Sequence, residues 1–144
     1  MSTFWRRVFN VQYRLLAWSD PAIRRVWRRN GIGNILELRV ARRGGKGERR
    51  RLVGLLHAGE GLYLGHPNGD AGWTRDLEAA GEGVLRYHNG VDWPFWAVRL
   101  APGDERDNAI RATGQHPFPG NFVYRLGRGH VRRQGVFFRL ESRA

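Results

Sequence analysis

The sequence predicts an α+β, mainly β protein: an antiparallel barrel or curled sheet with helices packed on its outside. Three features of the 144-residue chain indicate this. The first thirty residues have helical periodicity, the pattern changes to that of strands after Gly31 and Gly33, and later helical segments interrupt the strands irregularly. This is not the regular strand–helix alternation of a parallel sheet. We expect one domain, with a helical extension over residues 1–30 and a barrel core over residues 34–144.

Two helices are expected at the N-terminus. Over residues 3–17, polar side chains recur at helical spacing beside a wide apolar face. Asp20-Pro21 is typical of the start of a second helix, because an N-cap residue is followed by proline in the first turn. Arginines crowd the end of this second helix, where the helix dipole favours cations.

Strands follow, with two more helices inserted among them. Apolar and polar residues alternate from Leu36 to Ala41, as in a half-buried strand. A near-continuous apolar strand is expected over 52–56, and a turn then leads to a strand over 62–64. The remaining predicted elements are a helix over 71–80, strands over 84–87 and 95–100 joined through Asn89-Gly90, a helix over 102–112, a Pro/Gly loop over 115–120 and a strand over 135–140.

Positive charge is concentrated in the first third of the chain. The net charge is +12, and residues 1–51 hold 14 Lys and Arg against 3 Asp and Glu. This basic part closes with a Gly-rich turn, residues 42–51, that has cations on both sides. Glycines let the backbone approach a ligand closely, and guanidinium groups bind phosphate or carboxylate in pairs. The turn is therefore either a pocket for a multiply charged anion or a solvated hairpin tip.

Several classes of site are disfavoured by composition. The chain has no cysteine, which excludes disulfides, thiol catalysis and a Cys-based zinc site. Its five histidines lack metal-ligand spacing, so no metal site is expected. No apolar run approaches the ~20 residues of a membrane span. The apolar residues at the N-terminus are interrupted by Arg6, Arg7 and Arg14, unlike a signal peptide, so we expect a cytoplasmic protein.

A second informative stretch runs from His66 to Leu77. A strand ends, a tight His-Pro-Asn-Gly turn follows, and a helix begins. The free N–H groups at a helix start can bind an anion or ligand. A purely structural turn and helix cap is the commoner role of such a pattern.

The run from Ile35 to Leu77, with these two signals in this order, resembles the deazaflavin-dependent nitroreductase family. Residues 98–106 and 117–126 also look like segments of that family. The chain departs from it where Gly45 stands near the hydroxyl position of the family's Gly-Arg-x-Ser/Thr-Gly turn, and where Asp76 replaces a frequent Asn. The resemblance implies a split antiparallel β-barrel, related to FMN-binding pyridoxamine-phosphate-oxidase-like proteins.

The resemblance also implies an enzyme: an F420-dependent oxidoreductase of the nitroreductase or quinone-reductase kind. It would transfer a hydride between reduced coenzyme F420, a deazaflavin, and a quinone-like or nitro-aromatic small-molecule acceptor, with FMN as the alternative cofactor. Tyr124 is the candidate catalytic residue, as a proton donor or substrate contact, and a half-buried barrel tyrosine is its alternative role. The candidate cofactor-binding residues are Arg42, Arg43, Lys46, Arg49, Arg50, Leu52 and Val53 around the basic turn, and His66, Pro67, Asn68, Gly69, Trp73, Arg75 and Asp76 around the second turn.

Other functions remain open beside this one. The charge and six tryptophans suggest a nucleic-acid-binding module, but an alternating basic–aromatic strand face is missing, so we expect no nucleic-acid partner. A peripheral membrane protein anchored by residues 3–29 is compatible with a reductase, and packing of that helix on its own barrel is the alternative. We expect Trp5, Phe9, Phe122 and Tyr124 to border the acceptor pocket, and the oligomeric state stays open between monomer and homodimer.

Overall fold

The N-terminal extension is helical, as predicted. The computed structural model describes residues 2–18 and 20–143, and it describes side-chain surroundings for all of these except Ser2, residues 12–18, Asp20 and Ile23. The two helices are α1 (Ser2–Trp18) and α2 (Asp20–Asn30). The indole Nε1–H of Trp27 donates to the Ile35 carbonyl at 2.6 Å, which fastens α2 to the first strand.

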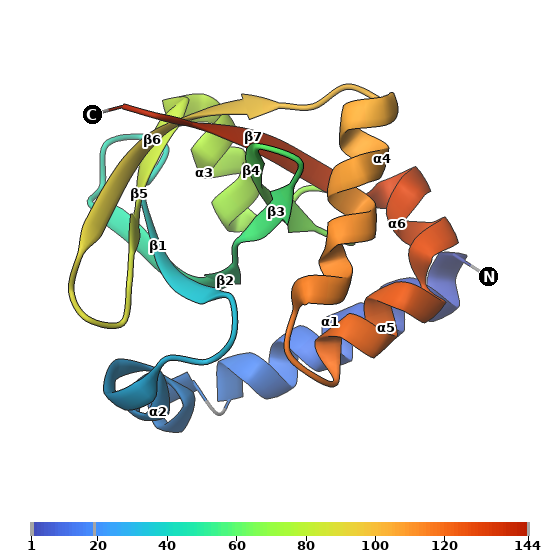
Figure 1. Cartoon of the computed structure of the whole chain (residues 1–144), viewed down its shortest axis with the longest axis horizontal. Helices are drawn as coiled ribbons and strands as arrows, with labels where there is room; N and C mark the ends of the chain where they lie inside the picture. Colours follow the sequence, from blue (N-terminus) through green and yellow to red (C-terminus); the bar gives the residue numbers. More distant parts are fainter. Residues whose placement is uncertain (1, 19, 144) are drawn as a thin grey trace.

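The described residues form one seven-stranded antiparallel sheet that curls into a split barrel (Figure 1). The strand order across the sheet is β2-β1-β5-β6-β7-β4-β3, and β2 also contacts β4. The predicted fold class is therefore confirmed. The strands are β1 (Ile35–Ala41), β2 (Glu48–Gly54), β3 (Leu56–Ala58), β4 (Gly61–His66), β5 (Glu82–Arg86), β6 (Asp92–Arg99) and β7 (Val136–Ser142).

The later helices lie on two sides of this sheet. Helix α3 (Gly72–Ala80) confirms the prediction of a helix over 71–80. It packs against β1, β5 and β6. Helices α4 (Asp104–Arg111), α5 (Gly120–Leu126) and α6 (Arg128–Gln134) gather at the other end, beside α1 (Figure 1). A 3₁₀ turn, η1 (Ala112–Gln115), joins α4 to α5.

Two apolar cores result from this arrangement. Consecutive residues of a strand point to opposite faces, so Phe137 and Phe138 of β7 enter different cores. Phe138 joins Leu77 of α3 in the core inside the barrel. Phe137 joins Phe9 of α1 in the core between the barrel and the helices at its other end. Each core thus supports one candidate site: α3 with the basic turn, and α1 with Tyr124.

The predicted continuous strand over residues 52–56 is wrong. Strand β2 ends at Gly54, and β3 begins at Leu56. At the break, the Leu55 N–H donates to the Asn34 carbonyl at 2.9 Å, and the Asn34 side-chain amide donates to the Leu55 carbonyl at 3.0 Å. The His116 ring also lies so close to Gly54 that a Cβ there would collide with it. These contacts stabilise the bend through which the chain passes from β2, at one end of the sheet order, to β3, at the other end.

The segment that carries Tyr124, for which no helix is predicted, is helical. The segment after cis-Pro119 forms two short helices, α5 and α6, which meet at Gly127. Each spans seven residues, too short to show a clear apolar period in the sequence. Gly127 is required there because the rings of Trp5 and Phe9 lie against its Cα. These helices are thus held by tertiary contacts with α1.

Candidate anion site at the start of helix α3

The basic turn is the tip of the β1–β2 hairpin and is open to solvent. The Arg42 N–H donates to the Gly47 carbonyl at 2.9 Å and closes the turn. Gly44, Gly45 and Gly47 have φ angles of 81°, 74° and 79°, in the left-handed region that favours glycine. No heavy atom lies within 4 Å of where their Cβ atoms would be. The turn therefore has room around it for a ligand.

Asp76 of α3 holds two arginines of this hairpin, and we call these three residues the Asp76 cluster. Its Oδ1 accepts hydrogen bonds from the backbone N–H of Arg43 at 3.3 Å and from Arg43 Nε at 2.8 Å. Its Oδ2 accepts from Arg49 Nε at 2.6 Å. The Asp76 side chain is 2% exposed, whereas those of Arg43 and Arg49 are 48% and 21% exposed. The acid is thus buried beneath two arginines that reach solvent.

Hydrogen bonding keeps Asp76 ionised. Burial raises the pKa of a carboxyl group, but the hydrogen bonds from Arg49 and Arg43 outweigh it and lower the pKa of Asp76 from 3.8 to about 2. Each arginine uses its Nε–H for this contact. The terminal Nη groups of both are left without a described partner, and the cluster keeps a net positive charge. Asp76 therefore holds two guanidinium groups on one carboxylate without neutralising both.

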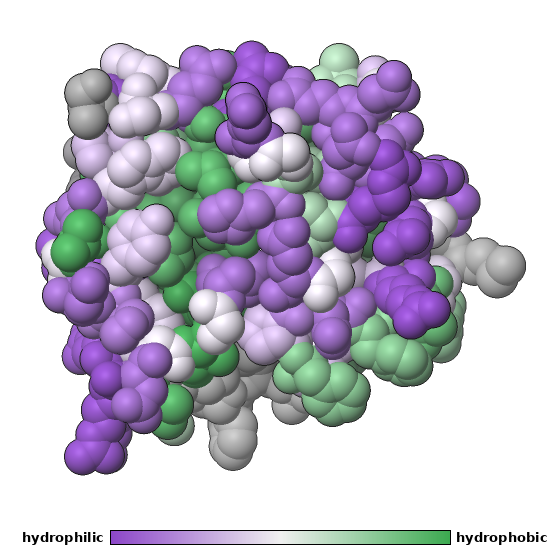
Figure 2. Space-filling view, in the orientation of Figure 1, coloured by the Kyte–Doolittle hydropathy of each residue, from purple (hydrophilic) through white to green (hydrophobic). Residues whose placement is uncertain are grey.

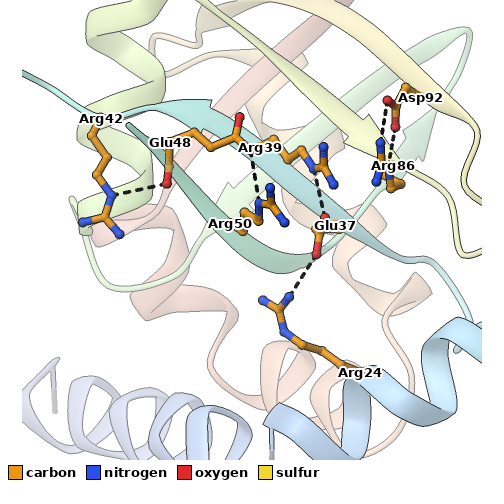
Figure 3. Close-up of polar contacts among 8 residues, drawn as sticks. All are labelled: Arg24, Glu37, Arg39, Arg42, Glu48, Arg50, Arg86 and Asp92. Atoms are coloured by element: carbon orange, nitrogen blue, oxygen red, sulfur yellow. Dashed lines mark hydrogen bonds and ion pairs between the residues drawn. The ribbon is translucent and has the colours of Figure 1, made fainter. Parts of the chain in front are cut away.

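Strand alternation separates the arginines of β2 into two sets. Arg49 and Arg51 are paired with the inward-facing Val40 and Leu38, and so share the inner face of the strand. Arg50 and Leu52 belong to the outer face, where Arg50 Nε contacts Glu48 at 3.1 Å (Figure 3). Arg51 was not among the predicted residues, although period-two alternation from Arg49 would have found it.

The outer face of β1 and β2 carries a separate network of charges (Figure 3). Glu37 of β1 is buried and contacts Arg24 of α2 at 2.9 Å and Arg39 at 3.1 Å. Arg42 donates from Nε to the Glu48 carbonyl at 3.4 Å. Arg42 and Arg50 thus lie in contacts apart from the Asp76 cluster, and Lys46 is exposed at the tip.

The His-Pro-Asn-Gly turn is tied together by its own side chains. His66 Nδ1 lies 3.0 Å from the Gly69 carbonyl oxygen, and Gly69 has a φ of 77°. Burial lowers the pKa of His66. The Ala71 N–H donates to the Thr74 hydroxyl at 2.7 Å, so one of the N–H groups at the start of α3 is already satisfied. Pro67 and Trp73 are buried, whereas Arg75 is exposed.

Asn68 anchors α1 to this turn. Its amide donates to the Arg6 carbonyl at 3.0 Å and to Asn10 Oδ1 at 2.9 Å. Its Oδ1 lies 2.7 Å from His130 Nε2, which therefore donates. Both donors of the amide are used inside the protein, so the Asn68 side chain has none left for a cofactor.

Tyr124 lies in the core between the barrel and the helices, and not beside the Asp76 cluster. It is 5% exposed, and its ring centroid lies 5.1 Å from that of Phe9 and 5.0 Å from that of His116. Phe122 of the same helix is 52% exposed, so the four predicted pocket residues do not line one described cavity. A catalytic role of Tyr124 stays a prediction, and it requires this part of the core to open.

A shallow cavity of about 510 Å³ lies next to the turn, and the sequence did not indicate it. Gly69, the connection from β6 to α4 and the end of α6 line it, and four of its lining residues are arginines. Arg99 is held by Asp70 at 3.0 Å and Glu78 at 2.7 Å, and Arg106 donates to the Gly135 carbonyl at 2.6 Å. Two of the four arginines, Arg99 and Arg106, are thus used for internal bonds.

Comparison with known proteins identifies the fold. No family model and no curated protein matches the chain. Among solved structures, the haem storage protein HutZ of Vibrio cholerae is 15% identical with a TM-score of 0.57, covering 86% of this chain and 89% of its own. A Clostridium acetobutylicum protein of the pyridoxine-phosphate oxidase family, related to general stress protein 26, is 11% identical with a TM-score of 0.52, covering 76% and 75%.

The fold is the split barrel of pyridoxamine-phosphate-oxidase-like proteins. A candidate 5-nitroimidazole antibiotic resistance protein of Bacteroides thetaiotaomicron has it as well, with 9% identity, a TM-score of 0.51 and coverage of 78% and 74%. At these identities the likeness shows the fold alone. No described helix is both long enough and apolar enough to cross a bilayer.

Proposed function

We propose that this protein is an oxidoreductase that binds the anionic part of a flavin-type cofactor at the Asp76 cluster. One observation carries the proposal: of the guanidinium donors of Arg43 and Arg49, Asp76 takes only the Nε–H groups, which leaves the terminal amino groups to bind phosphate or carboxylate in pairs. The residues present fit such a group, since two guanidinium groups lie beside an open glycine turn.

The residues of this chain would bind and orient the cofactor. Arg43 and Arg49 would hold its charged group, with Lys46 and Arg51 adding positive charge nearby. Val53, which is half-buried on the same face of β2, offers apolar contact further along the strand. The bound cofactor would supply the hydride chemistry, and the barrel would supply a site partly shielded from water.

Coenzyme F420 is the cofactor we favour, and FMN is the alternative. A multiply charged tail suits the excess of cations at the hairpin better than one phosphate does. The resemblance of residues 35–77 to the deazaflavin-dependent family supports this choice, whereas the likeness to a pyridoxine-phosphate-oxidase-family structure supports FMN. A quinone-like or nitro-aromatic acceptor follows from the same resemblance, and the fold shared with the candidate nitroimidazole resistance protein is compatible with it.

Titration of the purified protein with F420, and separately with FMN, tests this assignment. We expect quenching of F420 fluorescence with a micromolar or lower Kd that rises with salt, because exposed arginines would meet the tail. FMN should bind more weakly. Binding that prefers FMN or does not depend on salt would contradict the choice of F420, and binding of neither cofactor would contradict the proposed function.

A further inference from the structure

One corner of the molecule exposes large apolar side chains from two different helices. Phe118, Phe122 and Leu126 are 79%, 52% and 57% exposed, and they recur every four residues through α5 and the turn before it. On α1, Phe4 and Val11 are 60% and 53% exposed and share one helical face. Figure 2 shows this apolar area at the lower right, over α5 and bordered by hydrophilic residues. We call these five residues the apolar ridge.

Contacts between the helices bring the two parts of the ridge together. Phe9 of α1 packs on Tyr124 of α5, on the buried side of both helices. Trp5 lies against the Cα of Gly127, which directly follows Leu126, and Phe4 contacts Trp5 edge-on at 5.3 Å between centroids. Phe4 and Leu126 therefore border the same seam between the helices. The ridge is a surface of this fold, separate from the Asp76 cluster.

The charge around the ridge has one sign. The sequences of α1, α5 and α6 contain no Asp or Glu, whereas α4 has three acids in its first turn. Arg7 lies three residues after Phe4 and four before Val11, so this exposed arginine stands between them on one helical face, and the exposed Arg125 lies three residues after Phe122. A partner for this surface must be anionic at its edge and apolar beneath.

We infer that the apolar ridge docks on the surface of an anionic lipid membrane. Phenylalanine and leucine would enter the boundary between headgroups and acyl chains, and the flanking arginines would meet the lipid phosphates. A nucleic acid offers charge without an apolar layer for leucine. A second copy of this chain would place like charges face to face, since the sequences of α1, α5 and α6 contain arginines and no acids.

Vesicle co-sedimentation tests this inference and does not depend on any cofactor. We expect wild-type protein to pellet with phosphatidylcholine vesicles that contain about 30% phosphatidylglycerol, and much less with pure phosphatidylcholine. Replacing the exposed α5 residues in the variant Phe118→Ser/Phe122→Ser/Leu126→Ser should weaken the partition coefficient about tenfold or more. Its melting temperature should stay near that of wild type, because these side chains are exposed.

The matched control is Val91→Ser/Trp96→Ser/Val98→Ser, which removes exposed apolar residues of β6 and the turn before it. This control should pellet like wild type. The inference is overturned if wild type stays in solution with anionic vesicles, or if the two triple variants lose binding equally. It is also overturned if sedimentation velocity shows a vesicle-independent dimer that the α5 variant disperses, since the ridge would then join two copies of the chain.

Discussion

The two ends of the segment from His66 to Leu77 use buried polar groups in opposite ways. At one end, both N–H groups of the Asn68 amide donate to residues of α1, and the amide oxygen accepts a hydrogen bond from His130. At the other end, Asp76 binds two arginines that keep donors facing solvent. The comparison shows that a buried polar residue in a turn and the helix after it can either anchor another element or belong to a candidate site. What distinguishes them is how many donors remain once internal contacts are counted.

The two ends also differ in how they respond to protons. Burial, with the charges of Arg6 and Arg133, lowers the pKa of His130, whose Nδ1 is buried without a hydrogen-bond partner among the described residues. The anchor therefore favours a neutral histidine. The Asp76 cluster requires an ionised carboxylate, which the two arginines provide at any pH well above 2. Mild acid should thus weaken the helical end before it affects the Asp76 cluster.

The largest predicted effect comes from Trp73, which lies between the two ends. It is 7% exposed and contacts His66 and Phe138. Trp73→Ala should lower the free energy of unfolding by ~3–5 kcal/mol, because a large cavity is left in the barrel core. Trp96→Ala is the matched control, since Trp96 is 47% exposed, and it should cost under ~1 kcal/mol. Equal losses in urea unfolding would show that Trp73 does not support the segment.

The second prediction separates the anchor from the site. Asn68→Ala should cost ~2–4 kcal/mol, because it leaves the buried Nε2 of His130 without its partner and removes the bond to the Arg6 carbonyl. Cofactor affinity should be unchanged when measured well below the melting temperature. Asn10→Ala removes a single part-buried hydrogen bond from an exposed residue and should cost only ~1 kcal/mol. Loss of cofactor affinity at full stability in Asn68→Ala would make Asn68 a ligand and remove the distinction between the two ends.

The third prediction concerns acid. Burial lowers the pKa of His116 from 6.5 to about 4, so the unfolded chain binds a proton here that the folded chain excludes. Stability is therefore highest above pH 6.5 and should fall by roughly 3 kcal/mol as the pH drops toward 4. The lowered pKa values of His66 and His130 add to the same trend. Unfolding free energies of His116→Gln should show a flatter pH dependence, and an unchanged slope would contradict this origin.

Local patterns predicted the elements with clear periods, and missed what depends on tertiary contacts. The N-terminal helices, the helix carrying Trp73 and the alternating strand β1 follow from spacing alone. The pairing of Asp76 with Arg43 and Arg49 joins residues 33 and 27 positions apart, which no local pattern reveals. In the sequence, Asp76 was only a departure from a family pattern. In the structure, it is the residue that holds Arg43 and Arg49 together.

The arginines show where the sequence could have predicted more. Alternation along β2 is sufficient to separate Arg49 and Arg51 from Arg50. The cations of residues 42–51 are nevertheless predicted as one basic turn. Tyr124 illustrates the opposite case. Its burial depends on α1 packing over a short helix that has no clear period of its own, so only the fold could place it.

The most direct test of the account compares Arg49→Gln with Arg50→Gln in a fluorescence titration with F420. The two residues are adjacent, each change removes one positive charge, and only Arg49 belongs to the Asp76 cluster. We predict a rise in Kd of roughly tenfold to hundredfold for Arg49→Gln, since a charge-assisted hydrogen bond contributes ~1.5–3 kcal/mol, and a change within about twofold for Arg50→Gln. Equal effects of the two substitutions, or no effect of either, would contradict the claim that Asp76 positions arginines for a bound anion.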